Sequence, residues 1–236
     1  MKIELKIFTV ITGDLVRSRE SSGRQQLSRK IRLLIDHLSR EFRKEFSAPL
    51  ILTRGIDELS GVLKRSNMSY RICRLLNEGV YPHLFRFAVV RGTLDVDISS
   101  KNARRMDGPA FHTAADMIQR AKKENLYYCF NLGFQFTEFD PWLNELANLL
   151  HILRSGWSSH QLRVVQFYEK FGSQKSVAKE LGITQQAVSD ALRQAHWKEV
   201  KRVENMIDEV LEKYGSYNYN SLYLAKQARQ LVKGER

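Results

Sequence analysis

The first 139 residues alternate between segments with the period of a strand and segments with the period of a helix. Lys2–Thr12 first alternates apolar and polar residues and then runs apolar, which is typical of a buried strand. Gly23–Phe46 repeats apolar residues every three or four positions and therefore predicts a helix. The same reasoning predicts strands at 50–53, 61–63, 84–91 and 126–132, and helices at 66–78 and 107–123. This order predicts an α+β fold with helices over a mixed sheet.

From Pro141 onward the pattern is helical only. We expect an α/β domain over residues 1–139, a connecting helix over 140–157, three short helices over 158–197 and C-terminal helices over 198–236. Lys198–Tyr214 carries apolar residues alternately three and four positions apart, namely Val200, Val203, Ile207, Val210 and Tyr214. This row fits a short dimer seam and equally fits packing against the chain's own helices.

The second and third short helices have the spacing of a helix-turn-helix. Ala178 is small enough to let two helices approach closely, and Gly182 can adopt the left-handed conformation of the turn. Val188 follows on the inner face of the next helix, which Thr184 is placed to cap. The segment Ser158–Trp197 resembles the helix-turn-helix of sigma-factor region 4.

Residues on the outer face of this last helix are candidates for DNA contact. Glutamine pairs with adenine and arginine with guanine when a helix enters the major groove. The candidate base-reading residues are Gln185, Gln186, Ser189 and Arg193, and the candidate phosphate ligands are Ser173, Lys175 and Thr184. Asp190 on the same face favours the alternative, a three-helix bundle that contacts only protein.

The chain carries 38 Lys+Arg against 26 Asp+Glu, a net charge of +12, which favours an anionic partner such as DNA or a nucleotide. Residues 1–139 hold 24 basic and 15 acidic residues (+9), and residues 140–236 hold 14 and 11 (+3). The excess charge is therefore not confined to the helical part. No apolar stretch predicts a membrane span or a signal peptide, so we expect a cytoplasmic location without a membrane partner. Cys73 and Cys129 lack metal-site spacing and are expected to be buried thiols.

Acidic residues at two turns are candidates for metal binding. Asp14 follows an apolar strand, and Asp57 and Glu58 occupy a tight turn between two strands. If these strands are neighbours, the carboxylates meet at one sheet edge, where Mg²⁺ bound to a triphosphate is the candidate cofactor. The alternatives are a strand-end carboxylate at Asp14 that caps a helix or pairs with Arg19, and an ordinary acidic turn.

Several short motifs together resemble the SatD family: Ile11–Val16 with Ser18 and Arg19, Asp57-Glu58 with Gly61, Arg86-Phe87, and Asp107–His112. That family joins a domain similar to nucleotidyl cyclases to a C-terminal helix-turn-helix. The resemblance therefore implies a ferredoxin-like, nucleotidyl-cyclase-like mixed sheet followed by an all-α helix-turn-helix domain, and a homodimer.

The same resemblance assigns roles to individual residues. Asp14 and Asp57 would hold metal and Glu58 would be catalytic, because Arg54–Leu59 looks like the GGDEF hairpin of diguanylate cyclases. Gly55, His112 and Arg120 would contact the nucleotide. Ile56 replaces the second hairpin glycine, His112 stands at an Asn position, and Asp116 inverts the charge at an Arg position.

These observations support three hypotheses. The favoured one is a DNA-binding transcriptional regulator with a degenerate cyclase-like domain for sensing or dimerisation. The second is an active, metal-dependent nucleotidyltransferase or cyclase that acts on a nucleoside triphosphate. The third is an assembly module with neither activity.

Overall fold

The computed structural model describes residues 6–16, 23–133 and 139–215, with side chains up to Lys213. Ser18, Arg19 and the predicted helix after Gly215 lie outside the described residues. The elements are β1 (Ile7–Leu15), α1 (Arg24–Glu41), β2 (Phe46–Arg54), β3 (Glu58–Leu63), α2 (Ser69–Val80), β4 (Phe85–Thr93), α3 (Pro109–Glu124), β5 (Tyr128–Asn131), α4 (Phe139–Ser155), α5 (Ser159–Phe171), α6 (Gln174–Leu181), α7 (Gln185–Gln194) and α8 (Trp197–Gly215). The predicted α+β class with a mixed sheet is confirmed.

The chain divides into two compact units. Among the described residues, the first contains the chain up to Trp142 and the end of α8 from Asp208, and the second is Leu143–Ile207. All the strands of the described residues belong to the first unit. The described residues of the chain beyond Pro141 form helices and no strand. We call these the sheet unit and the helical unit.

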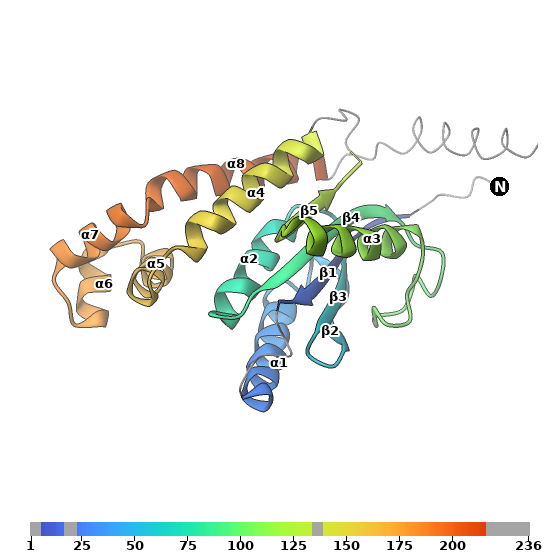
Figure 1. Cartoon of the computed structure of the whole chain (residues 1–236), viewed down its shortest axis with the longest axis horizontal. Helices are drawn as coiled ribbons and strands as arrows, with labels where there is room; N and C mark the ends of the chain where they lie inside the picture. Colours follow the sequence, from blue (N-terminus) through green and yellow to red (C-terminus); the bar gives the residue numbers. More distant parts are fainter. Residues whose placement is uncertain (1–5, 17–22, 134–138, 216–236) are drawn as a thin grey trace, which may run out of the picture. The chain divides into compact units, whose positions relative to one another are not determined.

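The sheet has the strand order β2-β3-β1-β4-β5. β1 is central and antiparallel to both β3 and β4, β2 pairs antiparallel with β3, and β5 runs parallel to β4. Neighbouring residues in this register point to the same face of the sheet. In Figure 1, α1 and α2 lie on one side of the sheet and α3 lies on the other.

The face under α3 is filled by small and medium-sized apolar residues. Val10, Val62, Ala88 and Val90 of the strands form one buried cluster with alanines and methionines of α3 and of the loop before it. The small residues permit close packing: a Cβ added at Gly92 of β4 would lie 3.2 Å from Cβ of Ala110. α3 therefore lies directly on β1 and β4.

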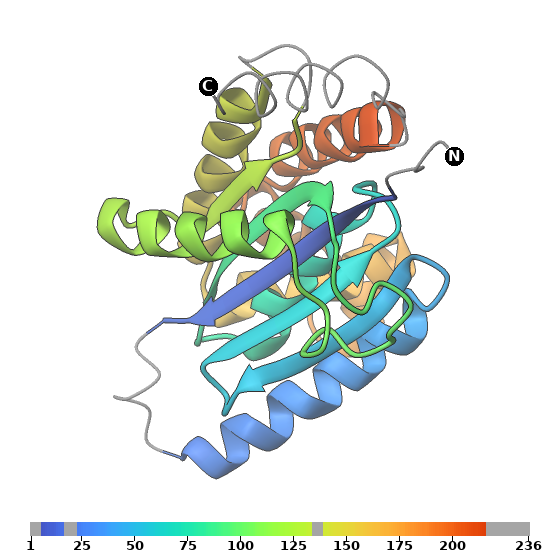
Figure 2. The same cartoon turned by 90° about the vertical axis from the view of Figure 1, so that its right-hand side faces the viewer.

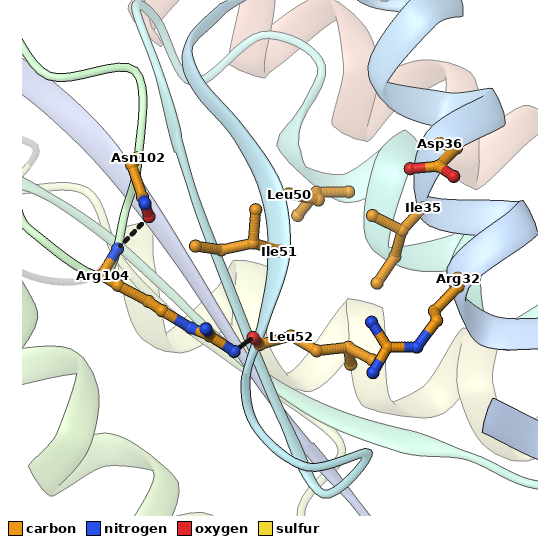
Figure 3. A pocket seen from close by; sticks show the side chains of 8 residues that line it. All are labelled: Arg32, Ile35, Asp36, Leu50, Ile51, Leu52, Asn102 and Arg104. Carbon is orange, nitrogen blue, oxygen red and sulfur yellow. Dashed lines mark hydrogen bonds between the residues drawn. The ribbon is translucent and has the colours of Figure 1, made fainter.

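A loop covers the exposed edge of strand β2. The Arg104 guanidinium donates to the Leu52 carbonyl, and the Asn102 side chain accepts from the Arg104 backbone N–H (3.0 Å). A cavity of about 320 Å³ remains beside this edge, lined by Arg32, Ile35, Asp36, Leu50, Ile51, Leu52, Asn102 and Arg104 (Figure 3). None of the residues predicted to bind DNA, metal or nucleotide lines it. The loop provides a hydrogen-bond donor, Arg104, for a backbone carbonyl that an edge strand would otherwise leave unpaired.

No helix in the described parts of the chain is long and apolar enough to cross a bilayer. Both cysteines are free and buried, as expected. Burial raises the pKa of Cys73 and of Cys129, so both stay protonated thiols near neutral pH.

Candidate functional site

The helical unit contains two short helices joined by a tight turn, α6 and α7. Each starts at a hydroxyl cap: Ser173 Oγ accepts from the Ser176 N–H (3.4 Å), and Thr184 Oγ1 accepts from the Ala187 N–H (3.1 Å). Gly182 ends α6 with φ 65° and ψ 33°, a left-handed conformation that glycine adopts without strain. The expected cap at Thr184 and turn at Gly182 are both present.

The helices α5, α6 and α7 pack against one another around a small apolar core. Val177 and Ala178 of α6 and Val188 and Leu192 of α7 are buried. Ser158 starts α5 with a reciprocal capping box, in which its backbone N–H donates to Gln161 Oε1 and its Oγ accepts from the Gln161 N–H. The caps and the core fix α7 against the other two helices.

The opposite face of α7 is polar. Gln185, Gln186 and Arg193 are exposed and Ser189 is half-buried. Asp190 lies among them and accepts from Arg193 Nη2 (2.6 Å) and from Gln186 Nε2 (3.2 Å). The structure therefore brings the candidate base-reading residues onto one face and links two of them through one carboxylate.

The predicted phosphate ligands lie at helix starts. Ser173 and Thr184 use a hydroxyl lone pair as a cap, which leaves each O–H free to donate to a phosphate oxygen. Lys175 is exposed in the first turn of α6. The backbone N–H groups of such helix starts also favour anions.

Arg154 near the end of α4 connects the helices of this unit. Its Nε lies 2.7 Å from Glu204 Oε1 of α8, and its Nη2 lies 3.8 Å from Glu169 Oε1 of α5. The guanidinium also lies over the rings of Trp157 (4.6 Å) and Trp197 (6.0 Å). Its side chain is 10% exposed and that of Glu204 is 2% exposed, so this is a buried charge network. Sequence reasoning missed it, although an arginine on an apolar helix face is a signal for such a network.

His151, one turn before Arg154, gives the helical unit a pH-dependent stability. Burial lowers the pKa of His151 to about 4, whereas a histidine in the unfolded chain titrates near 6.5. The stabilisation from the neutral ring is thus complete above pH 6.5 and is lost as the pH falls toward 4. Between pH 7.5 and 5 this histidine should account for about 2 kcal/mol of lost stability.

The measurement is denaturant unfolding at both pH values, followed by the fluorescence of the three tryptophans, all of which lie between residues 142 and 197. His151→Leu should lose about 2 kcal/mol less than the wild type over this interval. Equal losses in the two proteins would contradict the assignment.

In the sheet unit, Asp14 lies in a row of charged residues on the face that α3 covers. Its register partners are Glu58 on β3 and Arg86 on β4. Lys122, near the end of α3, places its Nζ 2.7 Å from Asp14 Oδ1. Glu58 has Arg54 Nη1 at 3.8 Å, and Arg86 Nη2 donates to Asn125 Oδ1 (3.1 Å). Asp14 is thus paired with a cation of the chain itself, Lys122.

Asp57 belongs to a different set of contacts. Asp57 Oδ1 lies 3.4 Å from Nη2 of Arg24, the first residue of α1. Helices α1 and α3 cover opposite faces of the sheet (Figure 1). Its backbone carbonyl accepts from the Leu15 N–H (2.7 Å). The structure brings Asp14 beside Glu58 and does not bring Asp14 and Asp57 to one shared cation.

The other candidate nucleotide residues are spread along the sheet unit. Gly55 forms the β2–β3 turn with φ 60°, next to Ile56, whose side chain is buried. His112 in the first turn of α3 contacts Asp107 (3.2 Å). It precedes Lys122 by ten residues, or about 15 Å along the helix. Arg120 lies toward the far end of α3 and pairs with Glu124 (3.9 Å).

The carboxylates of the sheet unit are the ligands that Mg²⁺ would need. Among the described residues there is no group of three or more His, Cys, Asp or Glu side chains that could hold a metal ion. The Lys122 ammonium is in direct contact with Asp14. A dication beside it would meet electrostatic repulsion. The described residues therefore do not form a metal centre made of protein ligands alone, and Mg²⁺ held together with a triphosphate stays a prediction.

These features define a protein of two parts, a mixed α+β sheet unit and a helical unit with an exposed polar helix. A model of the SatD family matches residues 8–211. The chain therefore belongs to the SatD family. A comparison with curated proteins found no match.

Proposed function

We propose that this protein is a DNA-binding transcriptional regulator that places α7 in the major groove of DNA. The polar face of α7, with Gln185, Gln186 and Arg193 exposed above a buried Val188, is the observation that carries this proposal. A helix with exposed amide and guanidinium groups, held by a glycine turn against a capped neighbour, has the form of a recognition helix.

The cation at Lys175 and the capping hydroxyls of Ser173 and Thr184 would then contact phosphates on either side of the groove. The segment 158–197 has five Lys+Arg against three Asp+Glu, a small excess. Affinity would therefore depend on a few well-placed phosphate contacts, and we expect each charged contact to contribute about one to the salt slope.

For the sheet unit we propose a ferredoxin-like, nucleotidyl-cyclase-like domain that senses a nucleotide or dimerises. The order β1-α1-β2-β3-α2-β4, with β3 and β4 on either side of β1, supports this. The separate cation partners of Asp14 and Asp57 favour sensing or dimerisation over catalysis with these two carboxylates. The active nucleotidyltransferase therefore gains no support from the geometry.

Fluorescence anisotropy of the full chain on a random-sequence duplex tests the proposal across a salt series. The wild type should bind at 50 mM salt, and Lys175→Ala should weaken binding to all sequences and lower the salt slope by about one. Lys123→Ala is the matched control, because it removes an exposed lysine from α3 of the sheet unit.

Absence of binding at low salt would contradict DNA recognition by this chain. A reduced slope for Lys123→Ala with an unchanged slope for Lys175→Ala would place the nucleic-acid contact on the sheet unit and not on α6 and α7.

A further inference from the structure

Helix α4 carries two adjacent rows of apolar residues, of which the chain itself uses only one. Leu143, Ala147 and Leu150 are buried. A second row remains exposed, and its members are Trp142 (68% exposed), Leu146 (39%), Leu149 (54%) and Leu153 (40%), with Ile152 (63%) beside it. The largest exposed apolar patch on a soluble monomer typically covers about 300–600 Å² and is often functional.

The exposed row has the geometry of a helix-pairing seam. Its members follow one another at spacings of four, three and four residues, so they lie within about 60° of one another around the helix. Such spacing is that of the a and d positions of a heptad. Glu145 is the only charged residue between Pro141 and Leu153. Glu145 lies one turn before Leu149 and flanks the row, whereas the row itself carries no charge that opposes contact with a second apolar surface.

We propose that this row, called here the α4 seam, is the surface through which two copies of the chain form a dimer. The area supports a second copy as the occupant. The four side chains of the row and Ile152 together expose on the order of 500 Å² per copy, and two such faces reach the roughly 1,000 Å² that a specific interface requires. The row is also uncharged and self-complementary, as a two-fold interface demands.

The row on α8, which the sequence offers as an alternative seam, is already occupied. Val200 and Ile207 are buried within the chain, and Val203 and Val210 are half-buried. The side chain of Tyr214 lies outside the described part. Packing within the chain therefore uses the α8 row and leaves the α4 seam for a partner.

Most of the α4 seam belongs to the same compact unit as α7, in which the Arg154 network links α4 to α5 and α8. A dimer formed on α4 would hold two copies of α7 at a fixed separation. The further step, that this separation matches two half-sites on DNA, rests on the proposed function.

Analytical ultracentrifugation of the full chain, without DNA, tests the dimer. The wild type should be dimeric at low micromolar concentration. Leu149→Glu should raise the dimer dissociation constant at least about 30-fold, because two carboxylates would have to be buried together. Leu33→Glu is the matched control, since Leu33 on α1 is also exposed (61%) and lies off the seam.

The double variant Leu146→Ala/Leu149→Ala introduces no charge and should also raise the dimer dissociation constant. Circular dichroism should show the helix content of the wild type in every variant. A wild type that is monomeric at 100 μM overturns the proposal, as does a Leu149→Glu variant that dimerises like the wild type. Because DNA is absent, either outcome leaves the proposed DNA binding to its own experiment.

Discussion

Replacing Arg154 by methionine should lower the free energy of unfolding of the helical unit by about 3–5 kcal/mol, because it leaves buried carboxylates without their cation. Glu204 is almost completely buried beside the guanidinium, and Glu169 approaches it from α5. The rings of Trp157 and Trp197 would also lose a cation stacked on them. Tryptophan fluorescence during denaturant unfolding reports the change.

The matching double variant separates charge from packing. Arg154→Met combined with Glu204→Met should recover most of the lost stability, since a buried ion pair replaced by apolar side chains of similar volume is often nearly neutral. Arg202→Met, at an exposed arginine of α8, should stay within about 0.5 kcal/mol of the wild type. If Arg154→Met behaves like Arg202→Met, the network does not hold the helices together.

Periodicity in the sequence predicts most of the elements, because apolar spacing reports directly which face of a segment is buried. It fails at the end of α1, where the predicted helix continues to Phe46. The helix ends at Glu41, and Phe42 and Phe46 are both buried on either side of the turn into β2. Two apolar residues four positions apart satisfy a helical period whether or not the chain between them is helical.

Side-chain direction is harder to predict than the elements themselves. The sequence places both Asp14 and Asp57 near strand ends, but it does not say what each carboxylate meets. Asp14 lies within β1, where the alternation of the strand sets its face, whereas Asp57 lies in the β2–β3 turn outside both strands. Asp14 faces α3 with its neighbours Glu58 and Arg86, whereas Asp57 meets α1. The alternation along β1 places Asp14 on the face of Val10, but which helix covers that face is long-range information that the local pattern does not carry.

For an amphipathic helix, the sequence likewise does not show which part of a broad apolar face is buried. The sequence shows one broad apolar face on Pro141–Arg154, and the structure divides it into a buried row and the exposed α4 seam. The division depends on where the neighbouring helices lie, which is long-range information. In α6 and α7, by contrast, the caps at Ser173 and Thr184 and the turn at Gly182 depend on residues a few positions apart, so the sequence predicts them.

Arg193→Ala should cost about 1–3 kcal/mol of binding at a preferred DNA site, selected beforehand from random duplexes, and Gln186→Ala should cost a similar amount. In the free protein both side chains are linked to Asp190, and the Arg193–Asp190 pair is 77% and 37% exposed. Exposed pairs of this kind contribute about 0–1 kcal/mol. A bidentate contact to a base is worth more, so releasing Arg193 from Asp190 favours the base contact.

The discrimination between sites distinguishes base reading from simple charge attraction. Each variant should relax the sequence preference at one base position. Gln186→Ala should in addition leave the affinity for random-sequence duplex nearly unchanged. Gln194→Ala, an exposed glutamine at the end of the same helix and about 80° around it from Gln186, is the control and should bind like the wild type. Should Arg193→Ala and Gln186→Ala both keep the wild-type preference, α7 does not read bases. Arg193→Ala that weakens all duplexes equally would instead make this arginine a phosphate ligand, since only a contact to a base edge carries information about sequence.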